Sequence, residues 1–374
     1  MSPSLLSTNM KNFWSLSAAG LALSFALVGC GSNNATTDTA PEGAMTSDAN
    51  AAPAGGAMSD TKINAAGATF PYPIYTKWFD DYKNKTGVEI NYQAVGSGAG
   101  IKQLKNNTVD FAGSDAPLKD KDMKDMPGEV IQFPSVGGAV VVAYNVKGAP
   151  ENLKMTGPLV ADIFMGKIKN WNDPAIAAAN PGVKLPAVGI NPAHRSDGSG
   201  TTNIFTTYLS QVSPEWKTKM GAGKTVDWPG GVGGKGNDGV TSAIRQGDGG
   251  IGYIELAYAM QNKINVAAIK NKAGNFVVPS AETTTNAIEG ALPLVQADIT
   301  APISNADGAQ AYPIAALTYI LVYKQGKSAE QTKATVDFLK WAMTDGQPEA
   351  AKLDYAPLPQ PLIDINMKAI EQLK

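Results

Sequence analysis

Short apolar runs alternate with amphipathic stretches from Ile63 to the end of the chain. Residues 72–87 (YPIYTKWFDDYKNKTG) repeat apolar side chains at helical spacing and predict a helix that ends at Gly87. Residues 88–96 alternate as a half-buried strand does, and residues 137–146 (GGAVVVAYNV) form the continuous apolar run typical of a strand buried on both faces. Strands that alternate with helices predict an α/β fold with mostly parallel sheets flanked by helices.

A second series of strands and helices follows in the middle of the chain. It includes residues 159–173, 187–212 and 249–261. A last apolar strand at 313–324 precedes an amphipathic helical stretch at 329–346. No repeat of solenoid length is visible, so we expect a fold built around ordinary hydrophobic cores.

The N-terminal segment, residues 1–29, is predicted to be a lipoprotein signal peptide. It carries Lys11, then an apolar stretch through Val28, and the sequence LVGC ends at Cys30. This apolar stretch is short for a membrane span but typical of a secretory signal. The LVGC sequence resembles a bacterial lipobox, which makes Cys30 the expected lipidation site. The alternative is an ordinary cleaved signal with an incidental cysteine.

Residues 30–61 are predicted to form a flexible tether behind the lipidated cysteine. After Cys30 this segment has no aromatic or large aliphatic residue apart from two methionines. It therefore buries too little apolar surface to offset the entropy lost on ordering. We expect a soluble globular body attached to a membrane face by one lipid-bearing residue.

Composition excludes several classes of site. Cys30 is the only cysteine, so no disulfide and no cysteine-based metal site can form within one molecule. The net charge is −2 with no basic block, which argues against nucleic-acid binding. No metal and no cofactor is expected. More than 300 residues after the signal are enough for two domains with their own cores.

Four short turns share one local design, in which a polar or glycine-rich turn leads from a strand into a helix. They are GATFP (67–71), GSGAG (96–100), SDAP (114–117) and RSDGSGT (195–201). Helix N-termini present unpaired N–H groups and the positive end of the helix dipole. Each turn alone is commonly a helix cap, but four together, one with Arg195, favour an oxyanion-binding site.

Two aspartates near these turns need an explanation, because carboxylates repel anions. Asp197 is placed to pair with Arg195 and to orient its guanidinium group, and it can also cap the following helix. Asp115 can only accept hydrogen bonds when ionised, so its anion must carry a proton. Phosphate carries such a proton at neutral pH and sulfate does not. The sequence therefore predicts discrimination against sulfate at Asp115.

Catalysis is the competing hypothesis. His194, Asp197 and Ser199 have the residue types of a catalytic triad, but they lie within six positions of one another, where side chains rarely align as nucleophile, base and orienter. No GxSxG elbow and no His or Cys cluster is present. The glycine-dense stretch 229–239 does not match a phosphate-binding P-loop, because Pro229 and Gly236 occupy its required Gly and Ser/Thr positions. We expect no enzymatic activity.

Six segments in order resemble the periplasmic phosphate-binding proteins of bacterial ABC phosphate importers. They are AGATFPYPIYTKWFDDYKNKTG, GSGAGIKQL, VDFAGSDAPL, RSDGSGTTNIFTTYL, GGKGNDGV and GGIGYIELAYA. The likeness runs from about Ile63 to the C-terminus without large gaps. It implies a type II periplasmic binding protein with phosphate in a cleft between two domains, 62–144 plus 314–374 and 145–313.

The resemblance also implies the ligand residues and the partners. The residues matching the family's phosphate ligands are Thr69, Phe70, Ser97, Asp115, Arg195, Asp197, Ser199, Gly200 and Thr201. Gly98 is a departure, because family members often have a second serine there. The implied partners are inorganic phosphate and the membrane permease subunits of an importer. The protein is expected to act in the periplasm, anchored to a membrane and monomeric.

The residues do not decide whether the phosphate site serves import, sensing or storage. A phosphate sensor or storage receptor without a transporter has the same site. Arsenate has phosphate's geometry and also carries a proton, so Asp115 does not exclude it.

Overall fold

The computed structural model describes residues 61–374. The predicted signal peptide, Cys30 and the tether as far as residue 60 lie outside the described residues. Between residues 61 and 374, no helix combines the length and the apolar character needed to cross a bilayer.

A nine-stranded sheet runs through the described residues. Its strands are β1 (Lys62–Gly67), β2 (Glu89–Ala94), β3 (Phe111–Ser114), β4 (Val130–Asn145), β6 (Asn191–Arg195), β7 (Val232–Gly234), β8 (Gly250–Glu255), β9 (Asn265–Val266) and β12 (Ala315–Tyr323). Their order is β2-β1-β3-β12-β4-β8-β6-β7, and β9 pairs with β4 outside this path. A smaller sheet contains β5 (Lys154–Met155), β10 (Ala268–Lys270) and β11 (Phe276–Val277).

The long strand β4 connects the two ends of the large sheet. Its first part, Val130–Ala139, pairs with β12, and its second part, Val140–Asn145, pairs with β8. Nearly every residue of β4 is buried, as its continuous apolar run predicted. Because β4 belongs to both ends of the sheet, it fixes how the turns at one end face the turns at the other.

The prediction of mostly parallel sheets was wrong in detail. The outer strands are parallel, since β1 pairs with β2 and β3, and β6 pairs with β7 and β8. The crossing strands are antiparallel, since β12 pairs with β3 and β4, and β4 pairs with β8. β12 therefore runs against β1, β2 and β3, whereas β4 runs in their direction and against β6, β7 and β8, so the sheet is mixed.

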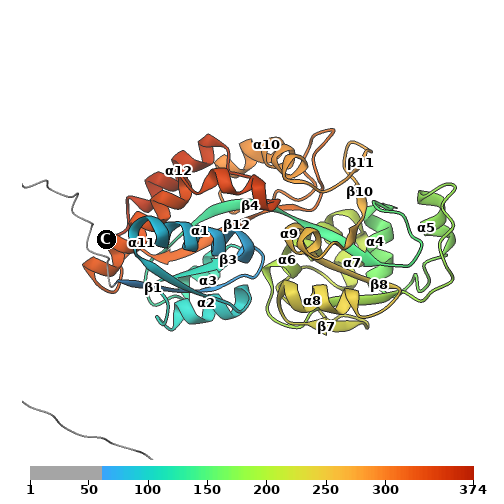
Figure 1. The fold of residues 1–374 in the computed structure, drawn as a ribbon, viewed down its shortest axis with the longest axis horizontal. Helices are drawn as coiled ribbons and strands as arrows, with labels where there is room; N and C mark the ends of the chain where they lie inside the picture. The colour runs from blue at the N-terminus through green and yellow to red at the C-terminus, as the bar shows by residue number, and fades with distance from the viewer. Residues whose placement is uncertain (1–60) are drawn as a thin grey trace, which may run out of the picture. The chain divides into compact units, whose positions relative to one another are not determined.

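Helices cover both ends of this sheet (Figure 1). The first group contains α1 (Tyr72–Thr86), α2 (Ser97–Lys105), α3 (Asp120–Lys124), α11 (Ala329–Met343) and α12 (Gln360–Ile370), with the short 3-10 turns η1 (Gln347–Glu349) and η2 (Ala351–Leu353). The second group contains α4 (Gly157–Phe164), α5 (Pro174–Ala179), α6 (Gly200–Val212), α7 (Pro214–Lys219), α8 (Gly236–Arg245) and α9 (Leu256–Gln261), whereas α10 (Ala281–Ala297) packs on the crossing strands β4 and β12. Among them, α2 packs on β1 and β3, and α8 packs on β6, β7 and β8.

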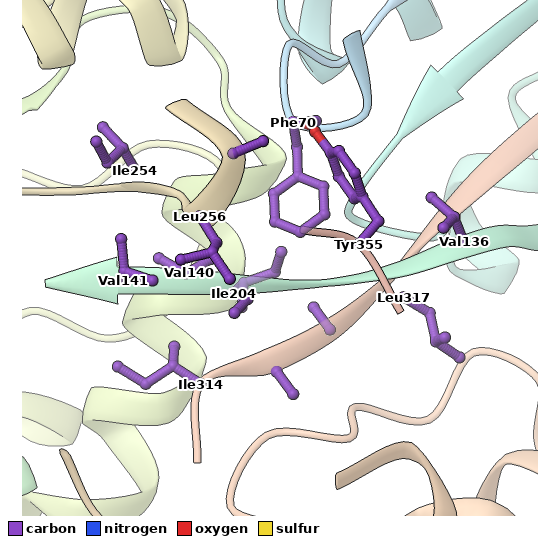
Figure 2. Packing of buried hydrophobic residues seen from close by; sticks show 14 of the residues in the cluster. Phe70, Val136, Val140, Val141, Ile204, Ile254, Leu256, Ile314, Leu317 and Tyr355 are labelled. Carbon is purple, nitrogen blue, oxygen red and sulfur yellow. Dashed lines mark hydrogen bonds between the residues drawn. The ribbon is translucent and has the colours of Figure 1, made fainter. Parts of the chain in front are cut away.

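One hydrophobic core cluster lies on both sides of the crossing strands. Figure 2 shows Phe70 and Tyr355 beside each other above β4, with Leu256 close to them. The rings of Phe70 and Tyr355 meet edge to face with centroids 6.3 Å apart. Phe70 follows β1, whereas Tyr355 belongs to the C-terminal segment, so the core ties distant parts of the chain together beside the turns described next.

Candidate functional site

The four turns singled out by sequence all lie at the carboxyl ends of parallel strands. Thr69 and Phe70 connect β1 to α1, Ser97 begins α2 after β2, and Asp115 follows β3. The fourth turn follows β6, which ends at Arg195, and leads into α6 at Gly200. In α/β sheets this is the edge at which helix N-termini point toward a ligand. Most side chains of the four turns are buried, as in a site closed to solvent.

The structure brings the second, third and fourth turns into contact. The Ser97 hydroxyl oxygen accepts hydrogen bonds from the backbone N–H of Gly200 at 3.2 Å and of Asp115 at 3.3 Å. A side chain at Gly200 would collide with Asp115 Oδ2 at 2.5 Å and with Ser97 Oγ at 2.6 Å. Glycine is therefore required there, because the start of α6 lies against the other two turns.

Backbone meets backbone where the second turn crosses the fourth. The Gly98 N–H donates a 2.8 Å hydrogen bond to the carbonyl oxygen of Gly198. A Cβ at Gly98 would lie 3.2 Å from Gly198 Cα, which is closer than side-chain carbons normally pack. Gly98, where relatives of the resembled family often have serine, thus lies where the backbones of the two ends of the sheet approach closely. Glycine fits there because it has no side chain.

Arg195 is held in one orientation by Asp197. Its Nε donates to Asp197 Oδ1 at 2.8 Å, and its Nη2 donates to Asp197 Oδ2 at 2.6 Å. The arginine side chain is only 1% exposed. Burial would raise the pKa of Asp197, but the hydrogen bonds and positive charge of Arg195 outweigh it and lower that pKa. The pair therefore stays ionised, and it fixes the guanidinium group as a donor, as the sequence predicted.

Asp115 has the opposite environment. Its carboxylate is buried, and Oδ1 accepts a 2.8 Å hydrogen bond from the Thr318 hydroxyl of β12. Burial raises the pKa of Asp115 to about 7. The hydrogen bond from Thr318 and the charge of Arg195 lower this pKa, but they offset the effect of burial only in part. No cation forms an ion pair with Asp115 among residues 61–374. This carboxyl group is available to accept a proton that a ligand brings.

Phe70 and Ser199 contribute mainly through their backbones and local caps. The Phe70 ring belongs to the core, and its carbonyl oxygen accepts a 2.6 Å hydrogen bond from the Tyr355 hydroxyl. Ser199 is the N-cap of α6, since its side chain accepts the Thr202 N–H at 3.0 Å. Both residues therefore stiffen the turn that carries them.

Several donors of the four turns have no acceptor inside the described chain. The backbone N–H groups of Phe70, Ser97 and Thr201 donate no hydrogen bond to any residue between 61 and 374. Each belongs to the first turn of a helix or lies just before one, where the dipole favours negative charge. Buried N–H groups need partners, so these three point to an oxyanion as the ligand.

One residue of the site was missed by sequence reasoning. Asn237, in the first turn of α8, donates through its side-chain amide to Thr69 Oγ1 at 2.9 Å and to Thr201 Oγ1 at 3.2 Å. Next to it, the Gly236 N–H donates to Asp197 Oδ1 at 3.1 Å. The glycine-dense stretch 229–239 does not match a P-loop, yet it too is a glycine turn that opens a helix, and this shared design was the available signal.

The geometry opposes a catalytic triad. The His194 ring stacks on Trp228 with centroids 5.1 Å apart, and Nδ1 lies 3.1 Å from the carbonyl oxygen of Arg195. In the part of the chain that the structure describes, no hydrogen bond joins His194 to Ser199. The same part holds no group of three or more His, Cys, Asp or Glu residues able to bind a metal ion.

Comparison with known proteins gives consistent matches over most of the chain. A family model described as "PBP superfamily domain" matches residues 49–345. A phosphate-binding protein PstS of Xylella fastidiosa is 47% identical over 346 residues, covering 92% of this chain and 93% of the relative. The protein of the same name from Methanocaldococcus jannaschii is 42% identical, covering 83% of this chain and 86% of the relative.

A solved structure shares the fold. It is a high-affinity periplasmic phosphate-binding protein (PfluDING) determined with bound phosphate, and it is 25% identical with a TM-score of 0.65. The match covers 82% of this chain and 92% of the other.

Proposed function

Since the chain belongs to the PBP superfamily and, within it, to the family of PstS phosphate-binding proteins, we propose that it is an extracytoplasmic receptor for inorganic phosphate. It binds phosphate at the four turns and delivers it to the permease subunits of an ABC importer. The observation that carries this proposal is a buried set of hydrogen-bond donors around one unpaired carboxyl group, Asp115.

The donors match the oxygens of phosphate. The N–H groups of Phe70, Ser97 and Thr201, the hydroxyl groups of the turns and the guanidinium group of Arg195 surround the anion. Hydrogen bonds to ionised groups are stronger than neutral ones, so this set can replace the hydration shell of the ion. Asp115 accepts the hydrogen bond of the phosphate hydroxyl group. A fully ionised sulfate offers no such proton and meets the carboxylate as a like charge.

Closure of two lobes completes the site. We divide the body into lobes 62–144 plus 314–374 and 145–313, with β4 and β12 crossing between them. The Ser97–Gly200 and Gly98–Gly198 hydrogen bonds join residues of different lobes. Such bonds form when the lobes close, which excludes water from the anion and presents a closed surface to the permease.

The N-terminal segment serves attachment. In this proposal, residues 1–29 are removed, Cys30 becomes lipidated, and residues 30–61 tether a monomeric body to the outer face of a membrane. One acyl-bearing residue anchors a protein without making it a spanning one. The protein has no catalytic step and needs no cofactor.

Isothermal titration calorimetry tests the proposed function. The purified chain is freed of carried-over phosphate and titrated with phosphate and then with sulfate. Tight one-to-one phosphate binding with no sulfate heat is the expected result. Equal binding of both ions would contradict the role of Asp115, and no heat from either ion would contradict the receptor itself.

A further inference from the structure

We propose that Asn237 is a positioning residue that turns the hydroxyl protons of Thr69 and Thr201 toward the bound anion. This inference rests on the proposed phosphate-binding function. It assigns Asn237 a role in anion affinity through the two threonines, with no contact of its own to phosphate.

The two hydroxyl oxygens each accept two hydrogen bonds. Thr69 Oγ1 accepts the Asn237 backbone N–H at 3.1 Å and its side-chain Nδ2–H at 2.9 Å. Thr201 Oγ1 accepts the Asn237 Nδ2–H at 3.2 Å and the Arg195 Nη1–H at 3.3 Å. All four residues are buried, with 4% exposure at most. One amide group therefore serves both threonines.

A hydroxyl group has one proton to donate and two lone pairs that accept. With both lone pairs occupied, each threonine can only donate. Neither Thr69 nor Thr201 donates its hydroxyl proton to any residue between 61 and 374. By contrast, Thr206 and Thr241, further along α6 and α8, donate theirs to backbone carbonyl oxygens at 2.7 Å. The site thus holds two hydroxyl groups as donors reserved for an anion.

The amide of Asn237 cannot reverse its orientation without cost. Its Oδ1 accepts the backbone N–H of Glu255 at 2.9 Å, at the junction of β8 and α9. A flipped amide would place two donors against each other there and would present an acceptor to the threonines, which would then direct their protons to Asn237. The bond from Glu255 therefore keeps Nδ2 facing Thr69 and Thr201.

The decisive variant is Asn237→Asp, which has the same shape but presents oxygen where Nδ2 was. The threonine hydroxyls then donate to the carboxylate and are lost to the anion, and a negative charge is added. Phosphate Kd measured by calorimetry at pH 8 should rise about 100-fold or more over the unchanged protein. The ratio of the two Kd values should fall as pH decreases, because the introduced carboxyl group regains one donor when it is protonated.

A second variant removes the amide without adding charge. Asn237→Ala should raise the phosphate Kd about 10-fold, with a ratio to the unchanged protein that does not vary with pH. In a Thr69→Val, Thr201→Val background, where no hydroxyl proton remains to be oriented, Asn237→Ala should change Kd less than about threefold. A purely structural role would give the same loss in both backgrounds.

Asn271→Asp is the matched control. Asn271 is another buried asparagine, and its Nδ2 donates to the carbonyl oxygens of Gly308, Ala309 and Ala311 at 3.1 Å. The change should lower Tm while leaving the phosphate Kd unchanged. Circular dichroism confirms that each variant is folded, and if Asn237→Asp does not fold, the alanine variant and its double-mutant cycle decide the question.

The outcomes separate this inference from the function on which it rests. If the unchanged protein binds no phosphate, the proposed function fails and the inference fails with it. If it binds phosphate tightly and both Asn237 variants bind within about threefold of it, only the role of Asn237 is overturned. Equal losses in the threonine and valine backgrounds would also overturn it.

Discussion

Asp197 and Asp115 belong to the same candidate site, but their surroundings shift their pKa values in opposite directions. Asp197 is locked to Arg195 by two hydrogen bonds, and its pKa is lowered. Asp115 is buried with one neutral donor, Thr318, and its pKa is raised to about 7. Both carboxyl groups feel the charge of the same guanidinium group, so the difference comes from the deeper burial of Asp115 and from the direct hydrogen bonds that Asp197 alone makes with Arg195.

An anion site can contain carboxylates if each one has its charge balanced in one of two ways. The negative charge of Asp197 is neutralised by the arginine that it orients, so it costs the anion little. Ionised Asp115 has no cation beside it in the described part of the chain, so under the proposed function its charge is tolerated only when the ligand's proton lies between the carboxylate and the ligand. Under the proposed function, Asp197 therefore supports affinity and Asp115 supports selectivity.

The largest effect is expected from removing the cation between them. Arg195→Ala takes away a buried donor of the anion and leaves Asp197 without its cation, although the Gly236 N–H still donates to that carboxylate. Phosphate binding should weaken by roughly 2–5 kcal/mol. Calorimetry measures this loss directly.

Arg245→Ala is the control, because Arg245 is the only other arginine of the chain and its guanidinium group donates to Asn262 at an exposed position. Its phosphate affinity should match that of the unchanged protein. If Arg195→Ala bound phosphate within about a factor of two of the unchanged protein, the anion would have to bind elsewhere.

The next effect concerns selectivity. Asp115→Asn removes the unpaired charge and supplies an amide that can donate or accept. Sulfate affinity should rise about 10- to 100-fold, because like charges no longer face each other, while phosphate affinity should stay within about 10-fold. Competition between labelled phosphate and sulfate measures the ratio. If the variant excluded sulfate as strongly as the unchanged protein does, Asp115 would not discriminate between ligands by accepting a hydrogen bond from their proton.

Many of the local elements around the two aspartates could be predicted from the sequence alone. The helix at Tyr72–Thr86 and the buried strand through 137–146 were identified from spacing and apolar runs. The four turns and the pairing of Arg195 with Asp197 followed from residue types at helix starts. The contacts that bring the turns together could not be predicted in this way. The hydrogen bond between Gly98 and Gly198, for example, joins residues far apart along the chain.

Two features were beyond local sequence signals for physical reasons. The antiparallel direction of β4 and β12 is set by the path of the chain between strands, and a buried strand has the same apolar pattern in either direction. Asn237 is an ordinary helix residue by propensity, and its contacts with Thr69 and Thr201 come from where α8 begins in space. Long-range packing, which short motifs do not encode, decides both.

A smaller effect is expected from pH, and it separates the two aspartates without mutation. A raised pKa of about 7 means that Asp115 is mostly protonated and uncharged below pH 7 and charged above it. Because protonated Asp115 can donate to sulfate, sulfate affinity should rise about 10-fold from pH 8 to pH 6. Sulfate itself does not titrate there, and Asp197, with its lowered pKa, stays ionised. Asp115→Asn should abolish the pH dependence, and a dependence that persists would place the titrating group elsewhere.

The smallest effect is expected at His194. Arg195 and the two aspartates carry the charges of the proposed site, whereas His194 stacks on Trp228 beside them. His194→Ala removes this stacking and the contact of Nδ1 with Arg195, which involves the backbone carbonyl oxygen and not the guanidinium group. Phosphate Kd should therefore change less than about threefold, within the range of a weak packing loss. A loss comparable to that of Arg195→Ala, measured with the same calorimetric titration, would add the histidine to these three residues as a fourth participant and would reopen the catalytic alternative.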